Sequence, residues 1–334
     1  KKGRVTTLGR NFSTYTAGAI SVALPETKEF RIYSDTEGVH VFDPRLIGNN
    51  IQTVLHLSQR ELYLFGKTGA KVVEPETIKM IINNKKTFPI YINHYAKPNG
   101  PGTEVTPKSV NDQPVIKGGG IRNVSYREFE LESPKQFEEI KKIIDSYKGA
   151  KIRDFQLENI LGSNRVRAKV EITMQIDEDN KLDDFGKPLT EEIKKKTGVN
   201  SFCYLNASTI GLVGEKAGAS NNLLSRVYKI LSQIEYPSKI NHLKDRFPVF
   251  YGGDEIDVIV PSEMVEQVTS KLNNHLKRIN VVLYGPGQVG ISLLQKIKSL
   301  YDDPGINVVG IVDNNGYITK AGGFSQKEIE KIIE

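Results

Sequence analysis

The feature that most constrains the fold is a regular alternation of apolar and polar residues from Arg165 to Ile176. A period of two places every second side chain on one face of a β-strand, so the pattern predicts a strand with one face in a core and the other in water. Because the edges of a sheet must be covered or paired, we also expect this region to self-associate. The residues on the predicted core face are Val166, Ala168, Val170, Ile172, Met174 and Ile176.

A similar order of elements occurs twice between Asn123 and Leu276. The first set predicts a strand over 123–131, a helix over 133–147 and the alternating strand. A charged segment over 177–199 follows, in which we expect a loop with a short helix. We interpret the two sets as a weak internal repeat of ferredoxin-like halves. The second set predicts a strand ending at Val213, a helix over 220–234, strands over 247–251 and 256–260, and a helix ending at Leu276.

The first hundred residues predict a different alternation of helices and strands. Ser58 and Glu61 stand three residues apart, as in a capping box at the start of a helix. Residues 107–121 contain few apolar side chains and three consecutive glycines, so we expect a linker there. The predicted helices cover 13–24, 58–65 and 75–82, and the predicted strands cover 30–33, 39–42 and 89–95.

A glycine-rich turn follows a short apolar strand over 280–284. The turn reads Gly285-Pro286-Gly287-Gln288-Val289-Gly290, and a helix and a second strand over 306–312 follow it. This context is typical of dinucleotide binding, because the glycines let backbone amides approach a pyrophosphate at the helix N-terminus. Asp313 stands at the end of the second strand, where a carboxylate would bind a ribose hydroxyl. The simpler alternative is an ordinary turn between a strand and a helix.

The composition excludes several classes of protein. The net charge of +6 is spread along the whole chain, which does not indicate a nucleic-acid partner. Cys203 is the single cysteine and the five histidines show no zinc spacing, so we expect no internal disulfide, no metal site and a reducing cytoplasm. No run approaches the roughly 18 apolar residues of a transmembrane helix, so we expect no membrane partner.

Several motifs in the N-terminal third place charged or hydroxyl groups beside turns. A cation at the start of a helix can hold a carboxylate or a phosphate. A glycine-flanked basic loop follows later, but it lacks the order of a Walker A sequence. Each motif alone is also explained by a solvated turn. The residues concerned are Arg10, Ser13, Ser34, Asp35, Arg45 and Lys71.

Together these motifs resemble a known family. The runs TLGRNFSTYTA, YSDTEGVHVFDPR, LFGKTGAKVVEP and INHYAKPNGPGTEV are similar, in order and spacing, to the C-terminal part of the aspartokinase catalytic domain. That family continues into paired ACT domains, which are small ferredoxin-like folds that bind amino acids. In the bifunctional aspartokinase/homoserine dehydrogenases, a Rossmann domain with a glycine fingerprint follows, where residues 279–290 stand here. The resemblance covers nearly the whole chain.

The resemblance implies an α/β and α+β chain of four parts. Residues 1–106 would be the C-terminal part of an amino-acid-kinase α/β sandwich, and residues 107–121 the linker. Residues 122–277 would be two ferredoxin-like ACT units, and residues 278–334 the first β-α-β of a Rossmann fold.

The resemblance also implies functions for particular residues. The parent enzyme would phosphorylate L-aspartate with ATP and Mg²⁺, and reduce aspartate semialdehyde with NADPH or NADH. Threonine or lysine would regulate it, and the ACT units would form a homo-oligomer. Arg10 and Ser13 would bind aspartate, and Ser34, Asp35, Arg45 and Lys71 would lie around ATP. Gly285, Gly287, Gln288, Val289, Gly290 and Asp313 would bind the dinucleotide, and Gly214, Ala219, Ser220, Asn221 and Asn222 the effector.

The sequence also departs from the family pattern. Phe12 and Thr14 stand where the family has glycine and aspartate, and no Lys-Phe-Gly-Gly phosphate-binding segment is found. We therefore expect the chain to be part of a longer protein and to have no kinase activity alone, because phosphoryl transfer needs positioned cations around the phosphates. The alternative is a non-enzymatic amino-acid sensor or assembly module with a degenerate kinase part. The catalytic residues, the effector, the oligomer number and the choice between NADH and NADPH stay open.

Overall fold

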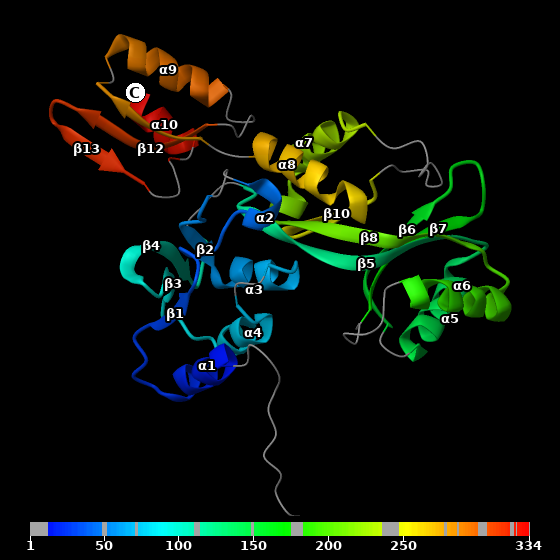
Figure 1. Cartoon of the computed structure of the whole chain (residues 1–334). Coiled ribbons are helices and arrows are strands. Elements are labelled where there is room, and N and C mark those ends of the chain that lie inside the picture. Colours follow the sequence, from blue (N-terminus) through cyan, green and yellow to red (C-terminus); the bar gives the residue numbers. More distant parts are fainter. Residues whose placement is uncertain are drawn as a thin grey trace, which may run out of the picture.

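Three β-sheets organise the part of the chain that the structure describes (Figure 1). They are found in a computed structural model, and the residues that it describes are 13–48, 52–70, 73–109, 114–147, 150–174, 183–235, 247–276, 279–285, 287–299, 306–320, 324 and 326–333. No helix within these ranges is both long and apolar enough to cross a membrane.

The N-terminal unit, residues 13–106, is built on a four-stranded sheet of order β1-β3-β4-β2. Strand β1 pairs with β3 in parallel, and β3 pairs with β4 in an antiparallel manner. The strand predicted over 39–42 is absent; only an isolated bridge joins His40 to Thr53, because Asp43 and Pro44 begin a helix directly after it. The elements are α1 (Ser13–Ala23), β1 (Phe30–Ser34), α2 (Pro44–Ile47), β2 (His56–Ser58), α3 (Gln59–Lys67), α4 (Pro75–Asn83), β3 (Ile90–His94) and β4 (Lys97–Thr106).

The central sheet has six strands in the order β6-β7-β5-β8-β10-β9 and contains the predicted repeat. Each half has the order strand, helix, strand, strand, helix, and the first strands of the two halves, β5 and β8, pair antiparallel at its centre. The two ferredoxin-like halves are therefore confirmed. The first half comprises β5 (Gly118–Leu131), α5 (Pro134–Ser146), β6 (Ala150–Asn159), β7 (Val166–Met174) and α6 (Asp183–Thr197). The second comprises β8 (Ser201–Val213), α7 (Asn221–Ser232), β9 (Val249–Gly252), β10 (Glu255–Pro261) and α8 (Val265–Leu276).

Three segments of the central sheet differ from the prediction, and the first is β6, which lies where no strand was expected. The segment expected to be a loop with a short helix contains α6, a helix of 15 residues, because Leu189 and Ile193 lie one turn apart and are fully buried. The triple glycine expected in a linker forms the first residues of β5. A Cβ on Gly120 would lie 2.5 Å from the backbone nitrogen of Ala70, so glycine there permits close approach of the N-terminal unit.

The central sheet is strongly coiled. Strands β6 and β9, at opposite ends of the strand order, approach each other, and Arg153 of β6 forms an ion pair with Glu255 of β10 at 2.6 Å. Twist between neighbouring strands accumulates in one direction and brings the edges together. In Figure 1 the helix pairs α5/α6 and α7/α8 accordingly lie on opposite sides of the long strands β5 and β8.

The C-terminal unit, residues 279–333, contains the predicted β-α-β arrangement. Strands β11 and β12 pair in parallel, and β12 continues into an antiparallel hairpin with β13. Leu283, Leu294 and Ile311 form its core with residues of α10, whereas Val282 and Tyr284 are exposed. The elements are β11 (Ile279–Tyr284), α9 (Gln288–Ser299), β12 (Ile306–Asp313), β13 (Gly316–Thr319) and α10 (Gln326–Ile333). The mixed α/β fold class is thus confirmed.

Candidate functional site

The residues predicted to bind aspartate and ATP are only partly within the described ranges. Arg10 and Lys71 lie outside them. Ser13 is exposed at the first position of α1. Ser34 ends β1, and its hydroxyl donates to Asp35 Oδ1 at 3.1 Å. Arg45 pairs with the carboxylate of Asp43, which also accepts from the Arg45 backbone nitrogen at 3.0 Å and so caps α2.

Ser34, Asp35 and Arg45 are therefore held by local turns. Asp35 and Arg45 bond to different partners, and the Arg45 side chain is 75% exposed. This leaves the guanidinium of Arg45 accessible to an anion from solvent, with the Asp43 carboxylate as its competitor.

The predicted effector loop, residues 214–222, connects β8 to α7, and most of its backbone amides bond inside the protein. The nitrogen of Gly214 donates to the carbonyl of Asp254 at 3.0 Å, and that of Ala219 to Gly253 at 3.2 Å. Ser220 caps α7 by accepting from the Leu223 nitrogen at 3.4 Å. Asn221 and Asn222 are exposed in the first turn of α7. A ligand that used the Gly214 or Ala219 amide would have to replace these bonds.

Helix α3 reaches into this loop through Glu61. The predicted capping box is confirmed: Ser58 Oγ accepts from the Glu61 nitrogen and Glu61 Oε2 from the Ser58 nitrogen. The same carboxylate also accepts from Lys117 Nζ at 2.8 Å and from the Glu215 nitrogen at 3.0 Å. The side chains of Glu61 and Lys117 are 2% and 7% exposed. Glu61 therefore both caps its own helix and makes a buried contact with the effector loop. The sequence alone did not indicate this second contact.

A cluster of buried charges, the junction cluster, lies where the end of α3 meets the central sheet. Its residues are Arg122, Arg153, Glu171, Glu255 and Asp257. Arg122 pairs with Glu171 at 2.9 Å and with Asp257 at 2.6 Å. The polar face of the alternating strand was predicted to be wet, but Glu171 is fully buried, and its carboxylate contacts Arg122, Arg153 and Thr209 of the same sheet. The charged residues in the strand pattern were the sequence signal for this cluster, but they did not indicate which residues would pair with each other.

Burial shifts the acid–base equilibrium of this cluster. Desolvation raises the pKa of Glu171, and desolvation together with the neighbouring Asp257 raises the pKa of Glu255, although Arg122 and Arg153 oppose both effects. Among the described residues, Glu171 Oε2 and Asp257 Oδ1 have no hydrogen-bond partner.

We expect the free energy of unfolding to depend on pH through Glu255. A carboxyl whose pKa is raised by folding binds protons more tightly in the native state, so its contribution is present below the unfolded pKa and is lost as the pH rises through the folded pKa. Glu255→Gln removes this titration. In urea unfolding from pH 4 to pH 8, the wild type should lose stability relative to the variant as the pH rises. A constant difference between the two proteins would contradict this expectation.

The glycine turn of the C-terminal unit is open to solvent. Gly285 has φ +67°, which favours glycine, and its nitrogen donates to the carbonyl of Val312 at 2.8 Å. A Cβ on Gly285 or on Gly287 would meet no atom within 4 Å. Gln288 and Val289 are exposed in the first turn of α9, and Gly290 follows them. This geometry leaves the space above the helix N-terminus that a pyrophosphate requires.

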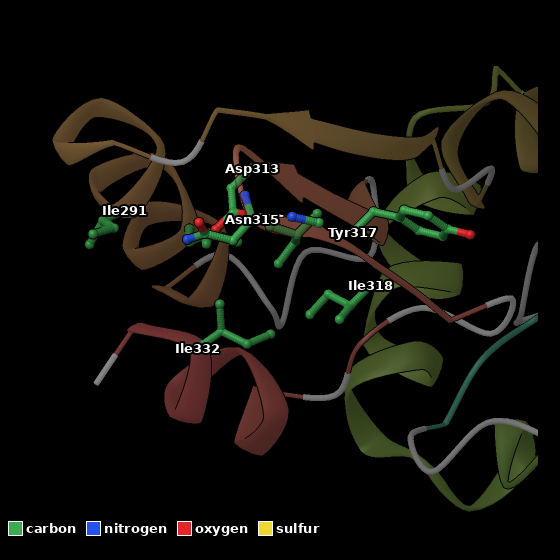
Figure 2. Close-up of a pocket in the computed structure, with 9 residues that line it drawn as sticks. Ile291, Asp313, Asn315, Tyr317, Ile318 and Ile332 are labelled. Atoms are coloured by element: carbon green, nitrogen blue, oxygen red, sulfur yellow. Dashed lines mark hydrogen bonds between the residues drawn. The ribbon is translucent and has the colours of Figure 1, made fainter.

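A cavity of about 450 Å³ lies beside this turn, between α9, the β12–β13 hairpin and α10. Figure 2 shows Ile291, Asp313 and Ile332 around it, with the Tyr317 ring directed away from Asp313. Asp313 Oδ1 accepts from the backbone nitrogens of Asn315 at 2.7 Å and Gly316 at 3.0 Å. One oxygen of the predicted ribose-binding carboxylate thus stabilises the hairpin turn.

Comparison with known proteins gives one family model and several relatives. A model described as Glutamate/Leucine/Phenylalanine/Valine dehydrogenase matches residues 259–334. It is not the homoserine dehydrogenase family, so it does not confirm that part of the prediction. The bifunctional aspartokinase/homoserine dehydrogenase of Haemophilus influenzae is 22% identical over 350 residues, covering 100% of this chain and 41% of that protein. An aspartokinase of Rickettsia felis is 33% identical over 111 residues, covering 33% of this chain and 27% of the relative.

Solved structures show the same relationship at the level of the fold. E. coli aspartokinase III in complex with aspartate and ADP (R-state) matches with a TM-score of 0.61 and 20% identity, over 82% of this chain and 57% of that one. The same enzyme in complex with lysine and aspartate (T-state) gives 0.58 and 22%, over 83% and 57%. The chain thus spans less than half of the two relatives and 57% of aspartokinase III. Its relatives and structural neighbours are aspartokinases, and over most of its length it has their mixed α/β fold.

Proposed function

We propose that this chain belongs to an amino-acid-regulated aspartate kinase that phosphorylates L-aspartate with ATP and Mg²⁺. The observation that carries this proposal is the placement of the four aspartokinase-like motifs. The described parts of these motifs lie in the N-terminal unit, and two ferredoxin-like halves pack against that unit through α3. In the related aspartokinase III, aspartate, ADP and lysine are bound. Arg10 and Ser13 would bind aspartate, and Ser34, Asp35, Arg45 and Lys71 would surround ATP.

Two measurements test this function. An assay of ADP release with aspartate and MgATP, on the protein encoded by the complete reading frame, should show turnover; asparagine, which lacks the side-chain carboxylate, is the control substrate. Calorimetric titration of this chain with threonine and lysine should show binding of one of them, with Gly214, Ala219, Ser220, Asn221 and Asn222 as the proposed site. Absence of turnover together with amino-acid binding would favour the non-enzymatic sensor instead.

The non-enzymatic sensor or assembly module is the second candidate. Its assembly role is favoured because β6 forms an edge of the central sheet. Phe155 and Leu157 of this strand are both 41% exposed. An unpaired edge strand with apolar side chains favours pairing with another copy. We propose a homo-oligomer formed through these halves, which light scattering at tens of micromolar would reveal as a mass above that of one chain.

We further propose that the C-terminal unit binds NADPH or NADH as the start of a homoserine dehydrogenase domain. The support is the open glycine turn after β11. Asp313 would bind the ribose, and the residues that would lie under the pyrophosphate are Gly285, Gly287, Gln288, Val289 and Gly290. When bound, the cofactor would supply the hydride that reduces aspartate semialdehyde.

Gly287→Val should abolish dinucleotide binding without unfolding the unit. A Cβ at this position has open space around it in the folded protein, but the valine side chain would occupy the volume of the pyrophosphate. Ligand-detected NMR with NADH and NADPH should show saturation transfer for the wild type and none for the variant. Circular dichroism provides the control for folding. Equal transfer to both proteins would exclude this turn as the cofactor site.

A further inference from the structure

Arg122 contacts three parts of the molecule at once. Its Nε donates to Glu171 Oε1 at 2.9 Å on β7, in the first half of the central sheet. Its Nη2 donates to Asp257 Oδ2 at 2.6 Å on β10, in the second half. Its Nη1 donates to the carbonyl of Lys67 at 3.4 Å, at the last residue of α3. The side chain is 11% exposed.

These three contacts join three separate cores. Strand β7 packs with α5 and α6, and β10 packs with α7 and α8. Helix α3 packs in the core of the N-terminal unit through Leu62, Leu64 and Phe65. Arg122 itself lies on β5, which pairs with both β7 and β8. A displacement of either half relative to α3 must therefore change the geometry around one guanidinium.

The residues around the guanidinium are closely packed. A Cβ on Gly211 would lie 2.3 Å from Thr68 Cγ2 and 2.9 Å from Asp257 Oδ1. The turn after α3 thus lies directly on β8, next to one of the carboxylates that Arg122 binds. Closely packed groups transmit a displacement because they cannot absorb it by local compression.

We propose that Arg122 is the positioning residue through which both halves of the central sheet act on the N-terminal unit. The proposal rests on the regulated function above and specifies its route. Movement of Glu171 or Asp257 shifts the guanidinium, which in turn releases or holds the Lys67 carbonyl and the turn over 68–70. In the sequence, that turn directly precedes Lys71, the proposed ATP residue. An arginine suits this positioning role because the N–H donors of its planar guanidinium have fixed directions and can hold three acceptors in one plane.

The experiment measures amide hydrogen exchange of Thr68, Gly69 and Ala70 by NMR in the ligand-free chain. These amides donate to the carbonyls of Leu64, Gly66 and Phe65, so their exchange reports on the end of α3. Glu171→Gln and Asp257→Asn should each accelerate it about tenfold, since each removes one charge that holds Arg122. Glu158→Gln is the matched control, because Glu158 pairs with Lys169 at 2.8 Å and makes none of the three Arg122 contacts.

The double variant decides whether the effect passes through Arg122. In an Arg122→Lys background, exchange should already be fast and Glu171→Gln should add nothing. An equal effect of Glu171→Gln in both backgrounds, or equal effects of Glu171→Gln and Glu158→Gln, would overturn the proposal. If Arg122→Lys does not fold, Arg122→Gln, which keeps two N–H donors, replaces it as the background for the same comparison. Amino-acid binding is measured separately by calorimetry, so the proposed function and this route can fail independently.

Discussion

Val170→Glu should unfold the first half of the central sheet. Val170 is fully buried in the core that β7 forms with α5 and α6, so the new carboxylate would have no partner and no water. Burying an unpaired ionisable group costs on the order of 5 kcal/mol, comparable to the whole stability of a small domain. Circular dichroism and urea unfolding should show loss of structure at 25 °C. Because Val170 lies in an internal core, the loss should not depend on protein concentration.

The same substitution at an exposed position is the control. Leu161 is 99% exposed in the turn between β6 and β7, so Leu161→Glu should leave the unfolding midpoint nearly unchanged. A Val170→Glu protein that unfolds at the midpoint of Leu161→Glu would show that Val170 does not lie in a closed core.

Glu61→Ala should destabilise the contact between α3 and the central sheet by about 3–5 kcal/mol, as expected when one partner of a buried ion pair is removed. The substitution leaves the ammonium of Lys117 buried without its carboxylate and removes the acceptor of the Ser58 and Glu215 nitrogens. Urea unfolding monitored by circular dichroism gives the change in free energy.

Two variants test the reason for this loss. Glu76→Ala removes a glutamate whose side chain is 55% exposed and pairs with Lys79, so it should cost no more than about 0.5 kcal/mol. Glu61→Gln combined with Lys117→Met keeps the helix cap and removes both charges, and it should recover most of the stability. If Glu61→Ala costs no more than Glu76→Ala, the buried contact is not a stabilising one.

Local sequence predicted most of the secondary structure for identifiable reasons. The four apolar side chains of α5 repeat at helical spacing, and Phe137, Ile140, Ile143 and Ile144 are its buried residues. Alternation over the strand now called β7 gave its core face correctly from Val166 to Ile172, whereas the Met174 side chain and Ile176 lie outside the described part of the chain. Helix α6 was underestimated because its charged side chains concealed two buried apolar positions. The triple glycine was assigned to a linker from its composition. In the structure these glycines allow the strand to lie close to another segment, and composition alone does not predict such a contact.

The candidate sites were predictable to a smaller extent. Ser58 and Glu61 were read correctly as a helix cap, but the bonds to Lys117 and Glu215 join residues 56 and 154 positions away. The turn at Gly287 follows a strand and precedes a helix as the local pattern predicted, and its use as a cofactor site stays a prediction. The effector loop was identified from its glycine and its place before a helix. That its backbone amides donate hydrogen bonds to residues 253 and 254 could not be seen from the local sequence.

The sequence by itself determined most of the elements, the two ferredoxin-like halves and the β-α-β unit, because periodicity, caps and turns act between residues close in the chain. Only the tertiary structure decided that the polar face of β7 is partly buried. It also decided that Arg122 binds Glu171, Asp257 and the end of α3. These partners are brought together by the coiling of one six-stranded sheet against α3. Because the coiling of the sheet accumulates over many strand pairs, no local sequence pattern specifies which charged side chains will meet in its interior.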